Sequence, residues 1–254
     1  MVAPFVPMQS RNQGRASERY IDSCMREKSE LFSSAESGEF EPLYSDATKA
    51  HITRDLLEVA LVFAFILVAV WTPQGRVNSF FSIVAAACVV AFAIAGRWGA
   101  HEMGLTRPLV GALNILLAGA LLCGAIAAIG TALRFAGAGN ALPWSRSWQY
   151  ALWALQQEFI LQSVFFLRLE SVLGSRRAVW AAASLYAVVH VPSPLLTVLS
   201  FLGGLLFCEF FRRWRNLYPL GIIHATLGLT IAASLPDKWL HHMRVGIGYL
   251  TMHS

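Results

Sequence analysis

Residues 148–169 read WQYALWALQQEFILQSVFFLRL, an apolar stretch long enough to cross a membrane that carries a carboxylate, Glu158, near its middle. Two further apolar stretches, AVWAAASLYAVVHVPSP at 178–194 and LYPLGIIHATLGLTIAASL at 217–235, carry His190 and His224. An ionisable side chain at membrane depth costs about 2.5–3.5 kcal/mol or more, so it usually faces a polar interior and serves a function. We therefore interpret these three residues as an acid/base or metal-binding set.

The composition is typical of an integral membrane protein. Of the 254 residues, 56% are hydrophobic and only 14% are charged, and the mean hydropathy is +0.53. Soluble domains carry roughly 25% charged residues. The net charge of +5 is explained by arginine-rich loops at the membrane surface, so it does not indicate a nucleic-acid partner.

Seven apolar runs predict an all-α fold, a polytopic transmembrane helical bundle of about seven spans, because a helix satisfies its own backbone hydrogen bonds in lipid. We expect residues 51–235 to form this bundle. Residues 1–50 are expected to form a polar, disordered cytoplasmic tail, and residues 236–254 an interfacial tail. The runs cover roughly 55–72, 79–96, 108–133, 148–169, 178–192, 194–211 and 217–235.

Basic residues in the loops predict the orientation, since cytoplasmic loops are rich in Lys and Arg. One side of the predicted membrane holds Lys49, Arg54, Arg97, Arg107, Arg168, Arg176, Arg177, Arg212, Arg213 and Arg215, and the other holds Arg76, Arg134, Arg146, Lys238 and Arg244. This asymmetry places the N-terminus in the cytoplasm. Arginine greatly outnumbers lysine, which indicates a GC-rich bacterial genome, so we expect a multi-pass protein of a bacterial inner membrane.

The three ionisable residues are predicted to share one depth. With a rise of about 1.5 Å per residue, Glu158, His190 and His224 lie about 15, 18 and 12 Å from the same side of the membrane. Gln162 shares a helix face with Glu158 at i,i+4. A lone buried histidine is often only hydrogen-bonded to a neighbouring backbone, but three such residues in one layer favour function.

The motifs around these residues resemble those of the CPBP family of membrane proteins, which includes the type II CAAX prenyl proteases and the bacteriocin-processing or Abi proteins. The family signature is Glu-Glu-x-x-x-Arg, then an aromatic-x-x-x-His, then His-x-x-x-Asn, each in its own transmembrane helix. Here Gln157-Glu158-x-x-x-Gln162, Tyr186-x-x-x-His190 and His224-x-x-x-Gly228 take these places. The resemblance covers about residues 100–235.

This resemblance implies an intramembrane endopeptidase that cuts a membrane-associated peptide or lipidated protein near its C-terminus, or a leader peptide. Glu158 would activate the water as general base, and His190 and His224 would orient the water or stabilise the oxyanion. Gln157, Gln162 and Gly228 replace the first Glu, the Arg and the Asn of the signature. Gln162 would then position the base or the substrate, and Thr226 or Gln162 would supply the donor lost at Gly228.

Three alternatives stay open at this point. Glu158, His190 and His224 resemble a catalytic zinc set with an open fourth position, so a divalent metal cofactor is a candidate even though HExxH is absent. The replaced signature residues also fit a catalytically inactive membrane scaffold or immunity-type protein on the same fold. Intramembrane Glu and His can further relay protons in a proton-coupled transporter.

Overall fold

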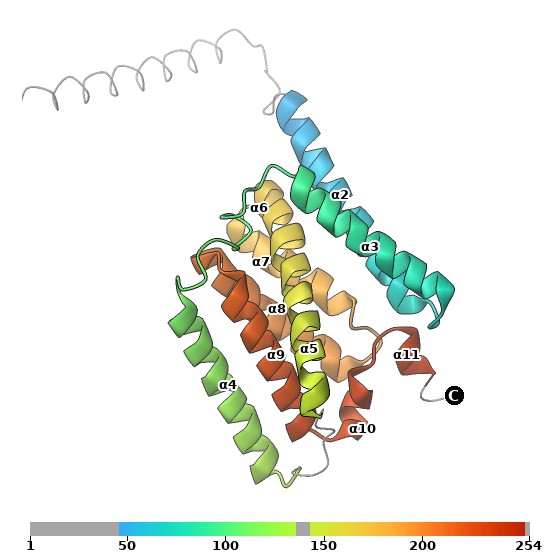
Figure 1. Cartoon of the computed structure of the whole chain (residues 1–254), viewed down its shortest axis with the longest axis vertical. Helices are drawn as coiled ribbons and strands as arrows, with labels where there is room; N and C mark the ends of the chain where they lie inside the picture. Colours follow the sequence, from blue (N-terminus) through green and yellow to red (C-terminus); the bar gives the residue numbers. More distant parts are fainter. Residues whose placement is uncertain (1–45, 136–142, 252–254) are drawn as a thin grey trace, which may run out of the picture. The chain divides into compact units, whose positions relative to one another are not determined.

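The computed structural model describes residues 46–135 and 143–251, and every regular element in these ranges is a helix (Figure 1). The prediction of an all-α fold is therefore confirmed. The chain divides into the units 1–50 and 51–254, and the second unit contains all the features described below. Most of the predicted cytoplasmic tail lies outside the described residues.

Seven helical segments follow the seven predicted runs. They are α2 (Asp46–Trp71), α3 (Arg76–Ala95), α4 (Ala112–Ala132), an unbroken run of α5 (Trp144–Glu158), η1 (Phe159–Phe166) and α6 (Leu167–Leu173), then α7 (Ser175–Val188), α8 (Pro194–Trp214) and α9 (Leu217–Ser234). Among the described residues four helices, α3, α4, α8 and α9, are long and apolar enough to cross a membrane. The count of seven spans stays a prediction, because α7 has only 14 residues and α2 carries Arg54, Asp55 and Glu58.

Three short helices follow α9 within the predicted interfacial tail: α10 (Asp237–Leu240), η2 (His241–Met243) and α11 (Ile247–Leu250). The backbone N–H of Gly246 donates to the Val191 carbonyl at 3.0 Å. Gly246 has a φ of +54° and lies directly against Val70 of α2. The tail therefore packs back onto the bundle.

Helix α9 lies between α4 and α5 (Figure 1). Glycines permit this close approach, as small residues commonly do at membrane helix interfaces. Gly119 of α4 faces Ile223, and a Cβ built on Gly221 of α9 would come within 2.6 Å of Leu155 Cδ1 in α5. The helix that carries His224 is thereby held against the helix that carries Glu158.

Arg168, which the charge asymmetry counts among the basic residues at the membrane surface, is only 1% exposed and lies inside the bundle. Its Nε donates to Glu58 Oε2 at 2.6 Å, and its other nitrogens donate to the carbonyls of Ser163 and Phe92, both at 3.0 Å. A buried charge is tolerated when it is paired and hydrogen-bonded in this way. The pair joins α2 and α3 to the run of α5, η1 and α6, here named the central helix, ten residues after Glu158.

Candidate active site

The central helix changes its winding immediately after Glu158. Residues Phe159–Phe166 form a π-helix, a rare conformation that is frequent at functional sites. Leu161 to Phe166 are all buried, and the Arg168 guanidinium binds the carbonyls of Ser163 and Val164 within this segment. The buried Glu58–Arg168 pair therefore contacts the π-helix directly, through hydrogen bonds from Arg168 to two of its carbonyls.

Glu158 is fully buried, and both of its carboxylate oxygens are hydrogen-bonded. Oε2 accepts a bond from Gln162 Nε2 at 3.0 Å, and Oε1 lies 2.8 Å from His224 Nδ1. Because a carboxylate only accepts, we assign the Nδ1 proton to His224 and leave Nε2 as the acceptor of the neutral ring. The pair thus has the arrangement in which a carboxylate orients an imidazole.

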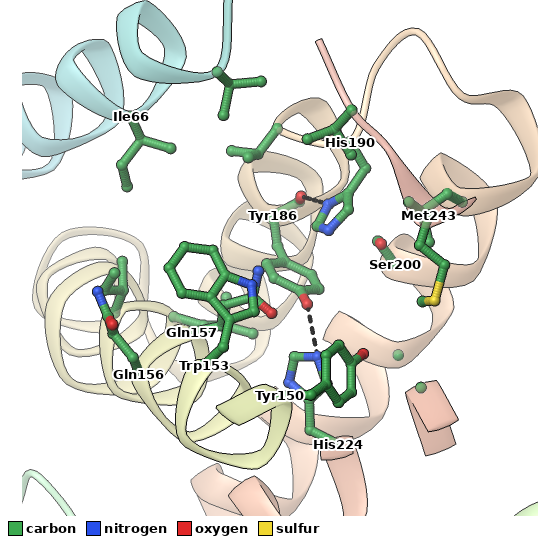
Figure 2. A pocket seen from close by; sticks show the side chains of 18 of the residues that line it. Ile66, Tyr150, Trp153, Gln156, Gln157, Tyr186, His190, Ser200, His224 and Met243 are labelled. Atoms are coloured by element: carbon green, nitrogen blue, oxygen red, sulfur yellow. Dashed lines mark hydrogen bonds between the residues drawn. The ribbon is translucent and has the colours of Figure 1, made fainter. Parts of the chain in front are cut away.

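The other ring nitrogen of His224 extends this chain of hydrogen bonds. Nε2 lies 3.2 Å from the Tyr186 hydroxyl, which donates to it under the same assignment (Figure 2). The His224 ring also stacks on Phe207 of α8, with ring centroids 5.3 Å apart. Three helices, α5, α9 and α7, therefore meet in one chain from Glu158 through His224 to Tyr186.

His190 joins the same cluster through Tyr186. Its Nδ1 lies 2.7 Å from the Tyr186 carbonyl, so this nitrogen is the donor and Nε2 is the acceptor (Figure 2). The run predicted at 178–192 ends earlier, since α7 stops at Val188 and His190 lies in the turn before Pro192 and Pro194. Proline has no backbone N–H to donate to the carbonyl four residues before it, so a helix is interrupted where prolines follow. The two prolines therefore explain why this helix is short.

A cavity of about 1610 Å³ opens in front of these side chains. Ligand pockets typically measure roughly 300–1000 Å³, so this space admits a large or extended ligand. Most of its lining residues are apolar and come from α2, α3, α5, α8 and α9. The polar group at one part of its wall comprises Tyr150, Gln156, Gln157, Tyr186, His190, Ser200 and His224 (Figure 2).

The structure brings some predicted site residues together and separates others. Glu158, Gln162 and His224 share one hydrogen-bonded cluster, and His190 is linked to it through Tyr186. Gln157 lines the cavity, whereas Glu158 lies behind His224 and does not. Adjacent helix positions point about 100° apart, which accounts for this difference.

The residues expected to replace the lost signature donor are engaged elsewhere. The Thr226 hydroxyl donates to the carbonyls of Ile222 and Ile223 on the exposed side of α9. The Gln162 amide nitrogen donates to Glu158. Gly228 lines the cavity beside Tyr150 of α5.

The candidate metal ligands bond to one another and to their neighbours. The Glu158 carboxylate bonds to His224 and Gln162, and Nε2 of His224 accepts the Tyr186 hydroxyl. Nδ1 of His190 donates to the Tyr186 carbonyl. In the described part of the chain no group of three or more His, Cys, Asp or Glu side chains is arranged to hold a metal ion. The zinc interpretation stays a prediction from sequence, and the chemistry proposed below uses no metal.

Sequence patterns predicted no part in the site for Tyr186, Tyr150, Glu58 or Arg168. Tyr186 was visible as the aromatic residue four positions before His190, a spacing that places both on one helix face. Tyr150 and the Glu58–Arg168 pair act across helices far apart in sequence, so no local pattern indicates them.

A comparison with known protein families finds a match over the region of the chain that carries this site. Residues 139–230 match the model of a family described as Type II CAAX prenyl endopeptidase Rce1-like. No curated protein and no solved structure matches the chain. The matched residues include Glu158, His190 and His224 and all the side chains that join them. The resemblance drawn from the motifs is therefore confirmed, since residues 139–230 are similar to a family of type II CAAX prenyl endopeptidases.

Proposed function

We propose that the protein is an intramembrane endopeptidase that hydrolyses a membrane-associated peptide or lipidated protein with a water molecule activated through Glu158 and His224. The observation that carries this proposal is the hydrogen-bonded chain from the buried Glu158 through His224 to Tyr186 at the cavity wall. The family match supports endopeptidase activity of the CAAX type in general.

In this mechanism Glu158 acts through His224. The carboxylate is fully buried and lies behind the imidazole, so a water in the cavity meets His224 Nε2 first. The water takes the place of the Tyr186 hydroxyl as the donor to Nε2, gives its proton to that nitrogen, and its oxygen attacks the carbonyl carbon of the scissile bond. Glu158 holds the ring in its tautomer and stabilises the imidazolium that forms. The imidazolium then returns the proton to the departing amine, which leaves a carboxylate and an amine.

The remaining polar groups bind water and substrate. His190 Nε2 is an acceptor for the second hydrogen of the attacking water. The Gln157 amide is a donor on the cavity wall for the peptide backbone, and the Tyr186 hydroxyl becomes one once the water replaces it at His224 Nε2. General base catalysis contributes about 10²–10⁴-fold. Each donor aimed at developing negative charge contributes about 10²–10³-fold.

The shape of the cavity supports a substrate with large apolar groups. Its walls come mainly from apolar helices, and its volume of about 1610 Å³ exceeds that of ordinary ligand pockets. Prenyl and acyl groups meet this description, as do apolar leader peptides. The bacterial inner membrane and the cytoplasmic N-terminus remain predictions from composition and loop charge.

The test is cleavage by the full chain in liposomes. The substrate is a farnesylated peptide that ends in Cys-aliphatic-aliphatic-Met, and peptides from bacterial membranes serve as a second substrate pool. We expect Glu158→Gln to lower kcat about 100-fold or more, because the amide no longer stabilises the imidazolium. Glu170→Gln is the matched control, since Glu170 lies on the same helix run and pairs with Arg215 outside the cavity. Cleavage at the wild-type rate by Glu158→Gln would overturn the proposal.

Binding without hydrolysis is the second candidate function. It is favoured by Gln157, an amide on the cavity wall at the position where the family signature has its first Glu. In that case the farnesylated peptide binds in the liposome assay, and no product that depends on Glu158 is formed.

A further inference from the structure

Tyr150 of α5 lies in a notch formed by Gly228 of α9. A Cβ built on Gly228 would overlap the Tyr150 hydroxyl and come within 2.8 Å of its Cζ and 3.0 Å of its Cε1. No side chain larger than hydrogen therefore fits at position 228 while the tyrosine ring keeps its place. The glycine and the phenol form a matched pair across two helices.

The Tyr150 hydroxyl is available to a ligand. Tyr150 is partly buried and lines the cavity together with His190 and His224 (Figure 2). Within residues 46–135 and 143–251 no hydrogen-bond partner exists for this hydroxyl. By contrast, Tyr186 donates to His224, and Tyr218 donates to the Leu105 carbonyl at 3.1 Å. A phenol that faces a cavity with its donor unused is suited to a polar atom of the substrate.

The position of this donor suits the scissile carbonyl group. Gly228 follows His224 by four residues, so the two lie on one face of α9 with Cβ positions about 5–6 Å apart. The Tyr150 hydroxyl occupies the start of the side-chain space of residue 228. A carbonyl carbon attacked by water on His224 Nε2 would thus have its oxygen within reach of Tyr150.

We propose that the Tyr150 hydroxyl donates a hydrogen bond to the carbonyl oxygen of the scissile peptide bond and to the oxyanion that forms from it. This inference rests on the proposed endopeptidase function. Gly228, at the place of the signature asparagine, removes an amide donor from α9, and Tyr150 supplies a replacement from α5. Gly228 is required at this place because it makes room for the Tyr150 ring.

The first arm of the test measures cleavage of the farnesylated peptide. We expect Tyr150→Phe to lower kcat about 100-fold while KM changes less than about twofold, because the donor acts mainly on the developing charge. Gly228→Ala should lose at least as much, since the added methyl group displaces the ring. Tyr249→Phe is the control; it removes a hydroxyl outside the cavity lining. In a Tyr150→Ala background, Gly228→Asn should restore at least about tenfold of the lost rate, the worth of one hydrogen bond to a charged group.

The second arm measures binding and does not need turnover. The aldehyde of N-acetyl-S-farnesylcysteine and the analogue with a methyl group in place of the aldehyde are titrated against wild type and Tyr150→Phe. The aldehyde should bind wild type about tenfold more tightly than the methyl analogue, and Tyr150→Phe should remove most of this difference.

The two arms separate the possible failures. If cleavage depends on Glu158 and Tyr150→Phe matches wild type in both arms, the role of Tyr150 is overturned and the endopeptidase stands. If no cleavage depends on Glu158 while aldehyde binding depends on Tyr150, the endopeptidase proposal falls and the carbonyl contact stands. Equal binding of the aldehyde and methyl analogues to wild type would overturn the Tyr150 inference directly.

Discussion

Helices α4 and α9 pack against each other, yet their side chains meet opposite surroundings. Helix α4 is the more apolar of the two, and only 11% of its most apolar 18 residues are buried, against 56% for α9. The exposed leucines of α4, such as Leu113 and Leu121, are suited to lipid. The buried face of α9 carries His224, Gly221 and Gly228. The less apolar helix therefore bears the chemistry, because polar groups and close contacts are tolerated only inside the bundle.

The largest expected effect is on the α9 side, at His224. His224→Gln removes the nitrogen that accepts the water proton, so we expect kcat to fall about 10³–10⁴-fold, toward the upper end for a lost general base. Because Glu158 acts through His224, the double variant Glu158→Gln/His224→Gln should lose no more than His224→Gln alone. Liposome cleavage rates measure both, with the exposed His101→Gln as control. Losses that multiply in the double variant would show that Glu158 acts on the water independently.

Arg168 gives the largest expected effect on stability. Arg168→Met leaves the buried Glu58 with only the half-exposed Arg54 as its partner, so the free energy of unfolding should fall by up to about 3–5 kcal/mol. Arg213→Met is the matched control, because Arg213 is 58% exposed and its pairing with Glu209 is worth at most about 1 kcal/mol. Thermal unfolding in detergent compares the two variants. Equal losses would mean that the buried pair does not support the central helix.

Glycine substitutions sharpen the comparison of α9 with α4. A methyl group at Gly221 would meet Leu155, so Gly221→Ala should cost about 1–3 kcal/mol of stability through overpacking. Gly124 of α4 has open space around it, so Gly124→Ala should cost nothing. Denaturant titrations of both variants provide the measurement. A stable Gly221→Ala protein would show that α5 and α9 can separate without loss.

The smallest effect is expected on the lipid-facing side. Leu121 of α4 is 75% exposed, so Leu121→Ala should change the free energy of unfolding by less than about 0.5 kcal/mol. Ile223→Ala on α9 removes a fully packed side chain and should cost about 2–5 kcal/mol. A large loss from Leu121→Ala would reveal that a second protein or chain covers this face of α4.

Sequence patterns predicted most of the helical architecture and the members of the candidate site. Apolar runs of membrane length indicated each main helix to within about four residues at its ends, except that α2 begins at Asp46, well before the predicted residue 55. The pattern works because it depends only on local composition. Glu158, His190 and His224 stood out because ionisable groups are rare in such runs. The π-helix after Glu158 and the early end of α7 were not predicted. Carbonyls of the π-helix bind the Arg168 guanidinium, and no local pattern indicates that this arginine lies inside the bundle.

The sequence by itself determined that the chain is a helical membrane protein with one Glu and two His at a common depth. Only the tertiary structure decided which position each of these groups takes in the site. It turned Glu158 toward His224 rather than toward the cavity, left Gln157 on the cavity wall, and set Tyr150 into the space at Gly228. Composition and spacing are properties of one helix at a time. The direction of a side chain and the partner it meets depend on how two or three helices pack together.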